Sequence, residues 1–245
     1  MHTAAMTTRS AFLGVTGAAA VAAALLWTQA PATAQAQSAD LAERTAAASR
    51  EFRAALQLEP NPQHGAELFS TCAACHGADA RGTQDGTIPA LAGQHVSVMV
   101  KQLVDFRHDR RWDERMQNFA ASHHLSDSQD LLDVATYAGS LPRWPPLAGG
   151  IGDGASLQAG AIAYFRHCET CHGPLGQGEL RRMRPRLAGQ HYQYLRRELE
   201  ETAAGQRLGM DAEHVRLIRA LSAPERLGVA DYLSRLSPDL ASPAR

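Results

Sequence analysis

The chain has 245 residues, of which 44% are hydrophobic and 20% are charged, and its formal net charge at pH 7 is -1. This composition is that of an ordinary globular protein, so disorder throughout the chain is not expected. The small net charge argues against general nucleic-acid binding, which needs a cationic surface to displace counterions from the phosphates.

The first 36 residues have the layout of a secretory signal peptide. Arg9 precedes an apolar stretch of 17 residues, and small residues then lead to Ala34 and Ala36, after either of which cleavage is predicted. The stretch is shorter than the roughly 20 residues that span a bilayer, so a retained membrane anchor is the less favoured alternative. An exported, periplasmic protein is therefore predicted, with peripheral membrane association left open.

An N-terminal extension over residues 37–60 follows, and its segment 41–60 has a helical pattern whose role the sequence does not reveal. Beyond it, two parts of the chain repeat each other. The matching pairs all lie 96 residues apart: Cys72 and Cys168, His76 and His172, Gly82 and Gly178, Pro89 and Pro185, Phe69 and Phe165, Leu125 and Leu221, and the string LAGQH at 91–95 and 187–191. The register slips by one residue only near the end. The sequence therefore predicts a duplicated domain, with copies at 61–142 and 155–240.

The segment 143–154 between the copies is rich in Pro and Gly, which favours a linker. Within each copy, apolar residues at helical spacing precede the cysteine pair, follow the LAGQ string and follow a capping serine near the end. Both domains are thus predicted to be all-α. A domain of this size buries little core by itself, so another group is expected to fill its middle.

The four cysteines all lie in two pentapeptides, CAACH at 72–76 and CETCH at 168–172. The spacing Cys-x-x-Cys-His is the attachment signature of c-type haem, in which two thiols form thioethers with the porphyrin and the histidine reaches the iron. A thioredoxin-like redox pair would need a βαβ pattern, which is missing here. Half a zinc site would leave the histidine after both pairs unexplained. Two covalently bound haem c groups, each with an iron, are therefore predicted, held by Cys72, Cys75, Cys168 and Cys171, with His76 and His172 as metal ligands.

With these motifs, the sequence resembles the dihaem class I cytochromes c, and most closely the cytochrome c4 family. Each copy has the Cys-x-x-Cys-His motif, a Gly-rich loop, Pro-x-Leu-Ala-Gly-Gln, a helix, a methionine-containing loop and a final helix, over roughly residues 60–237. The resemblance implies two tandem class I cytochrome c domains, each a small helical bundle around its haem. It also implies that Pro89 and Pro185 present their carbonyls to the two histidines.

The resemblance further implies a methionine as the second ligand of each iron. Met116 has the expected place in the first copy; Met99 fits a core position better, and the rivals are His108, His123 and His124. In the second copy Met210 occupies the equivalent loop, with His214 as a competitor, although adding the offset of 96 residues to Met116 gives position 212, an alanine. Met183 lies on the wrong side of the Pro-x-Leu-Ala-Gly-Gln element.

An iron with two protein ligands has no open position for a substrate, so the prediction is an electron-transfer protein without a catalytic residue. Methionine ligation raises the reduction potential, which suits one-electron transfer in a respiratory chain. The expected partners are redox proteins, namely an electron donor and a terminal oxidase or reductase. Two alternatives stay open: a dihaem enzyme of the peroxidase or thiosulfate-oxidising type, and a haem subunit of a larger oxidoreductase complex.

Charge is distributed unevenly between the two copies. Residues 37–154 carry 10 Lys and Arg against 15 Asp and Glu, a net charge of -5, whereas residues 155–245 carry 13 against 10, a net charge of +3. This asymmetry predicts that charge steers the encounter with a redox partner.

Overall fold

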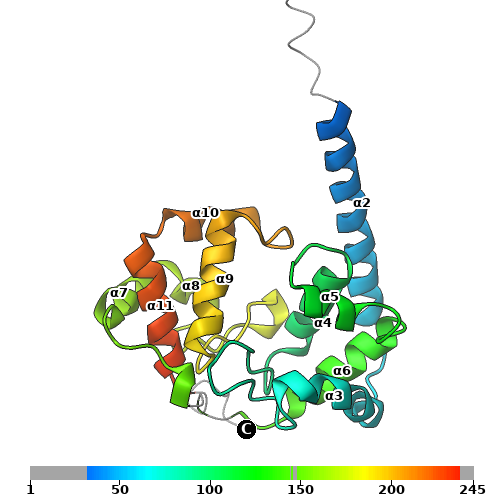
Figure 1. Ribbon diagram of the computed structural model, residues 1–245, viewed down its shortest axis with the longest axis horizontal. Coiled ribbons are helices and arrows are strands. Elements are labelled where there is room, and N and C mark those ends of the chain that lie inside the picture. The colour runs from blue at the N-terminus through cyan, green and yellow to red at the C-terminus, as the bar shows by residue number, and fades with distance from the viewer. Residues whose placement is uncertain (1–31, 144, 146–147, 238–245) are drawn as a thin grey trace, which may run out of the picture. The chain divides into compact units, whose positions relative to one another are not determined.

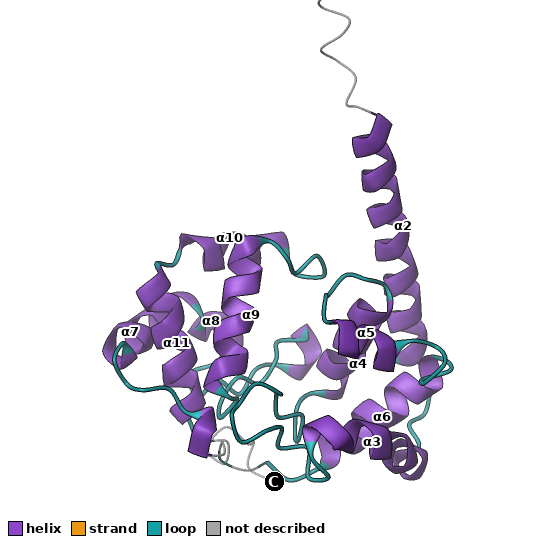
Figure 2. Ribbon diagram, in the orientation of Figure 1, coloured by secondary structure: helices purple, strands orange, loops and turns teal. Residues whose placement is uncertain are grey.

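A computed structural model describes residues 32–143, 145 and 148–237 (Figure 1). Within these residues the chain consists of helices and loops, and no strand is present (Figure 2). Residues 1–31 of the predicted signal peptide lie outside the described residues. Its predicted cleavage positions, Ala34 and Ala36, fall in the first turns of helix α2 (Ala32–Ala55). In the described part of the chain, no helix combines the length and the apolarity that crossing a membrane requires.

The C-terminal half of α2 packs against the first repeat. Ala48 and Ala55 are buried in its hydrophobic cluster, and Phe52 packs against that cluster. Arg107, on a helix of the first repeat, forms an ion pair with Glu51. The segment whose role the sequence does not reveal therefore adds apolar surface to the first domain.

The first repeat contains α3 (Pro62–His76), α4 (Val96–Arg107), α5 (Glu114–Ala120) and α6 (Ser128–Ser140). Asn61 caps α3 through its side chain, with proline at the first helical position, and Asp127 caps α6. A Cβ atom on Gly65 would lie 2.1 Å from the Asp133 carbonyl oxygen, so the glycine allows α3 and α6 to cross closely.

The second repeat contains α7 (Leu157–His167), α8 (Glu169–His172), α9 (Tyr192–Ala204), α10 (Ala212–Ala220) and α11 (Ala223–Arg235), with short 3₁₀ helices η1 (Ala148–Gly150) and η2 (Leu180–Arg182). Here α7 and α11 cross at Gly160, whose Cβ would lie 1.9 Å from the Gly228 carbonyl. Ser222 and Glu225 form a capping box at the start of α11.

One pair found by subtraction is not equivalent in space. Phe69 is buried at 3% exposure and its ring lies 5.4 Å from that of Tyr137, whereas Phe165 is 48% exposed. Tyr164 fills the corresponding position, fully buried with its ring 5.3 Å from Tyr232. The offset between these aromatic pairs is 95 residues, so the second copy has one extra residue between its aromatic anchor and its first cysteine.

Candidate functional site

Both Cys-x-x-Cys-His motifs lie at helix C-termini. His76 is the last residue of α3 and His172 the last residue of α8, and their side chains are 6% and 7% exposed. Each is followed by a glycine with positive φ, Gly77 at 78° and Gly173 at 77°, which turns the chain away from the helix. Within the described residues, none of the four cysteines forms a disulfide. Each motif thus presents two thiols and a buried imidazole on one helix end.

A proline carbonyl orients each imidazole. Nδ1 of His76 donates to the carbonyl oxygen of Pro89 at 3.0 Å, and Nδ1 of His172 donates to that of Pro185 at 3.2 Å. Because a carbonyl can only accept, the proton is on Nδ1 and the lone pair is on Nε2. Burial lowers the pKa of His76, and it lowers the pKa of His172 to about 4. Both rings are therefore neutral at pH 7, which is the form that binds a metal.

The two motifs line a cavity of about 970 Å³, a volume at the upper end of the range for ligand sites. The cysteines, His76, His172 and many apolar side chains of both repeats form its wall. This wall fits haem: it offers thiols for the porphyrin edge, an imidazole nitrogen for the iron and an apolar surround for the macrocycle. Its lining includes core residues of both domains, such as Phe69, Val134 and Leu233.

Buried cationic groups complete the fit. Arg111 and Arg207 line the cavity, are each 8% exposed, and form ion pairs with the same carboxylate, Glu198. Both also donate to the side-chain oxygen of Gln102, at 2.9 and 3.0 Å. Burial lowers the pKa of Arg207 to about 9, which leaves it charged at neutral pH. Two guanidinium groups share one carboxylate, so this cluster suits a ligand that bears carboxylates of its own, as haem does.

Met116 lies on the cavity wall of the first domain, on the third residue of α5. Its histidine rivals are engaged elsewhere: His108 contacts Glu51 at 2.6 Å, His123 contacts Asn118 at 3.2 Å, and His124 contacts Asn118 at 3.4 Å.

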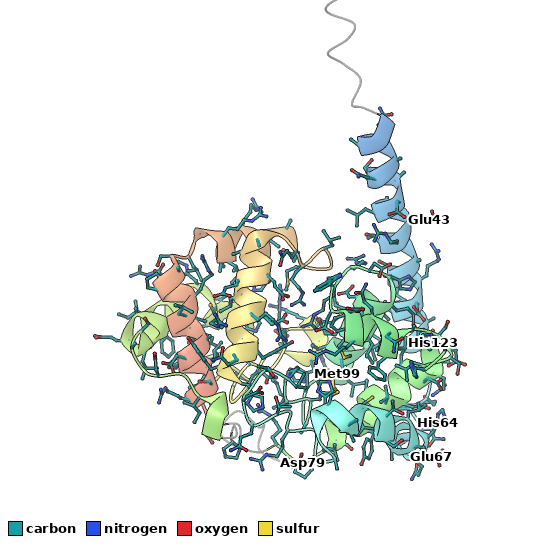
Figure 3. The ribbon with its side chains drawn as sticks, viewed as in Figure 1. Glu43, His64, Glu67, Asp79, Met99 and His123 are labelled. Atoms are coloured by element: carbon teal, nitrogen blue, oxygen red, sulfur yellow. The ribbon has the colours of Figure 1, made fainter. Side chains whose placement is uncertain are left out.

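Met99 also lines the cavity, from α4, and is 7% exposed within the hydrophobic cluster of the first domain (Figure 3).

In the second domain, Met210 and His214 both line the cavity. The ring of His214 faces that of His172, with 6.1 Å between the ring centres and 47° between the ring planes. Burial is the main cause that lowers the pKa of His214. Met183 follows η2 in the left-handed conformation and is 39% exposed.

A family model described as Cytochrome c matches this chain twice, at residues 62–142 and 157–236. Cytochrome c4 of Thiocapsa roseopersicina is 35% identical over 188 residues, which are 72% of this chain and 93% of that protein. The chain belongs to the dihaem cytochrome c4 family.

Two further similarities agree with this assignment. The crystal structure of reduced recombinant cytochrome c4 from Pseudomonas stutzeri superposes with a TM-score of 0.64 at 27% identity, covering 73% of this chain and all of that one. A protein of Stutzerimonas stutzeri named thiosulfate dehydrogenase electron acceptor is 34% identical, over 67% of this chain and 78% of that protein. As a member of the cytochrome c4 family, the chain is an electron carrier with two covalently bound haem c groups in tandem cytochrome c domains.

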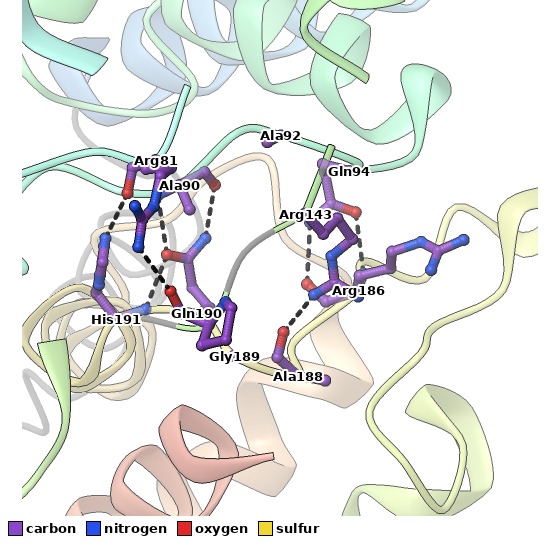
Figure 4. Close-up of a pocket in the computed structure, with 11 residues that line it drawn as sticks. Arg81, Ala90, Ala92, Gln94, Arg143, Arg186, Ala188, Gly189, Gln190 and His191 are labelled. Atoms are coloured by element: carbon purple, nitrogen blue, oxygen red, sulfur yellow. Dashed lines mark hydrogen bonds between the residues drawn. The ribbon is translucent and has the colours of Figure 1, made fainter. Parts of the chain in front are cut away.

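In this chain, two glutamines form reciprocal hydrogen bonds between the first and the second domain (Figure 4). Gln190 of the second domain accepts from the N–H of Ala90 at 3.0 Å and donates to its carbonyl at 2.8 Å. Gln94 of the first domain does the same to Arg186, with both distances 2.9 Å. We refer to these four hydrogen bonds as the crossed glutamine clamps.

Each clamp holds a peptide group that also forms a hydrogen bond with the histidine of a Cys-x-x-Cys-His motif. The Pro89 carbonyl, which accepts from His76, and the Ala90 N–H, which donates to Gln190, belong to one peptide group. A continuous chain of hydrogen bonds therefore runs from the histidine of one domain to the glutamine of the other.

The sequence prediction named the histidines, cysteines and prolines but missed two groups. The arginine cluster around Glu198 joins residues far apart in the chain, and no local motif marks it. The clamp glutamines did carry a signal, because LAGQ recurs at one register in both copies. A buried polar residue in a repeated string is a candidate for a structural hydrogen bond.

Proposed function

We propose that this electron carrier is exported to the periplasm and passes single electrons between redox proteins of a respiratory chain. The observation that carries the proposal is the pair of buried histidines, each with Nδ1 bound to a proline carbonyl and its ring at the wall of the shared cavity. When bound, haem supplies a one-electron redox centre. The histidines hold the iron side, the cysteines fix the macrocycle edge, and the apolar wall keeps water out.

The ligand set follows the same reasoning. His76 and Met116 are the proposed ligands of the first iron, and His172 is the proposed proximal ligand of the second. For the distal side of the second iron, the sequence predicts Met210, with His214 as the alternative. Pro89 and Pro185 orient the proximal rings through their hydrogen bonds to Nδ1 of His76 and His172.

Domain limits and location belong to the same proposal. The apolar stretch after Arg9 and the small residues before Ala36 support export with cleavage. We propose that the copies span 61–142 and 155–240 with a linker at 143–154. N-terminal sequencing of the protein from a periplasmic extract tests this: a start after Ala34 or Ala36 supports export, and an intact N-terminus in the membrane fraction contradicts it.

The expected partners are an electron donor and a terminal oxidase or reductase. A second candidate donor is an enzyme that oxidises thiosulfate, because one relative is named as the electron acceptor of thiosulfate dehydrogenase. Stopped-flow spectroscopy of the oxidised holoprotein distinguishes the roles. Reduction by a donor enzyme plus thiosulfate, but not by thiosulfate alone, supports a carrier. Turnover of thiosulfate or peroxide by the isolated holoprotein would support the enzyme alternative.

A further inference from the structure

The helices α5 and α10 begin in the same way. Asp113 caps α5, and its side chain accepts from the backbone N–H of Met116 at 3.0 Å. Asp211 caps α10 and accepts from the backbone N–H of His214 at 3.3 Å. Met116 and His214 are each the third residue of their helix. The two helix starts are therefore equivalent, at an offset of 98 residues.

By this equivalence, Met210 does not occupy the position that corresponds to Met116. Met210 directly precedes the capping Asp211, so its counterpart in the first domain is Trp112, which directly precedes Asp113 and is 72% exposed. The constant offset of 96 residues fails here because the loops on either side of the two helices differ in length.

The distance between two rings supports the same assignment. A histidine nitrogen binds a first-row metal at about 2.0–2.1 Å, and the ring centre lies about 1.1 Å further away, so two imidazoles on opposite sides of one metal have centres roughly 6.2–6.4 Å apart. The centres of His172 and His214 are 6.1 Å apart. The 47° between the planes is compatible with a shared axis, since each ring can rotate about its own metal–nitrogen bond.

His214 also keeps its ring available. Among the residues that the structure describes, its imidazole makes no hydrogen bond; only its backbone N–H is engaged, with Asp211. The histidines of the first domain near the equivalent loop differ, because His108 contacts Glu51 and His123 contacts Asn118. The third residue of the helix is thus Met116 in the first domain and His214, whose ring makes no hydrogen bond to the described residues, in the second.

We propose that His214, and not Met210, is the distal ligand of the second haem iron, which is then held by two histidines. This inference rests on the proposed function and deepens it. Methionine ligation raises the reduction potential of a haem, so the second haem has a lower reduction potential than the first. Electron transfer inside the chain then has a direction, from the second domain to the first, and the donor docks at the second domain.

The test is ligand spectroscopy of the oxidised holoprotein. Electron paramagnetic resonance and near-infrared magnetic circular dichroism, quantified per haem, are expected to show one His/Met haem and one bis-His haem. Two His/Met haems would overturn the proposal, and so would a high-spin second haem. These spectra do not depend on a partner protein or on turnover. If the spectrum has the expected form but electron transfer to partner proteins fails, the proposed function is refuted and the ligand assignment is not.

Three variants sharpen the assignment. Met210→Leu is expected to leave the bis-His signal unchanged, whereas loss of a His/Met signal in this variant would overturn the proposal. His214→Met is expected to convert the spectrum to two His/Met haems and to raise the lower potential. Met116→Leu is the matched variant of the first domain and is expected to remove the His/Met signal alone. Haem content and far-ultraviolet circular dichroism show that each variant has folded.

Discussion

Replacement of Gln190 by alanine is expected to weaken the fold and to change the haem of the other domain. The Gln190 side chain is 9% exposed and takes part in three hydrogen bonds, two with Ala90 and one with the backbone N–H of His191 at 2.9 Å. At about 1 kcal/mol for each bond, the free energy of unfolding should fall by roughly 2–4 kcal/mol. Denaturant titration of the holoprotein measures this loss.

The redox effect follows from the shared peptide group. A bond to the Ala90 N–H polarises the Pro89 carbonyl and strengthens its bond to His76 by roughly 10–30%. A stronger hydrogen bond to Pro89 makes the His76 imidazole a better electron donor to ferric iron. Weakening this hydrogen bond therefore raises the reduction potential of the first haem. For a bond of about 1 kcal/mol the change is roughly 0.1–0.3 kcal/mol, or about 4–13 mV.

Spectroelectrochemical titration at fixed pH and ionic strength resolves the two potentials. The matched variant is Gln94→Ala, which should raise the second potential and leave the first in place. The reasoning is refuted if Gln190→Ala shifts only the potential of its own domain, or if both variants lower the free energy of unfolding by less than about 0.5 kcal/mol.

Three further predictions concern the first domain. Gly65→Ala would place a Cβ 2.1 Å from the Asp133 carbonyl oxygen, so the free energy of unfolding should fall by about 1–3 kcal/mol; an unchanged denaturation midpoint would contradict this. The hydrogen bond to Asp133 raises the pKa of His64 above 6.5, so its stabilisation is complete below pH 6.5 and is lost as pH rises through the raised pKa. Melting temperatures of wild type and His64→Gln should therefore converge as the pH rises, and parallel curves would exclude the effect. The double variant of Cys72 and Cys75 to alanine should retain one covalent haem per chain by mass spectrometry, whereas retention of two would show attachment elsewhere.

The helical fold and the paired Cys-x-x-Cys-His motifs were readable because both signals are local. Helical periodicity, capping residues and the repeat offset each depend on neighbours in sequence. The same offset was misleading where the copies differ in loop length. Phe165 matches Phe69 by subtraction, yet Tyr164 is the buried residue, because α7 ends at His167 and a separate short helix carries the second cysteine of the motif.

The distal ligand of the second domain shows what local reasoning can still add. Adding the offset of 96 residues to Met116 gives position 212, whereas aligning the capping residues Asp113 and Asp211 gives His214. A helix cap is fixed by hydrogen bonds to the first turn, so it marks a position in space better than a constant offset does. The repeated LAGQ string marks the clamp glutamines but not their partners, since each clamp joins residues 92 or 100 positions apart.

The reciprocity of the clamps has an evolutionary consequence. Gln94 holds the second domain as Gln190 holds the first, which is the self-complementary relation of an isologous dimer. A single-domain ancestor with one LAGQ string would have carried both halves of this contact, so two copies could pair before their genes were joined. Within one chain the same contact is intramolecular, so it does not depend on protein concentration.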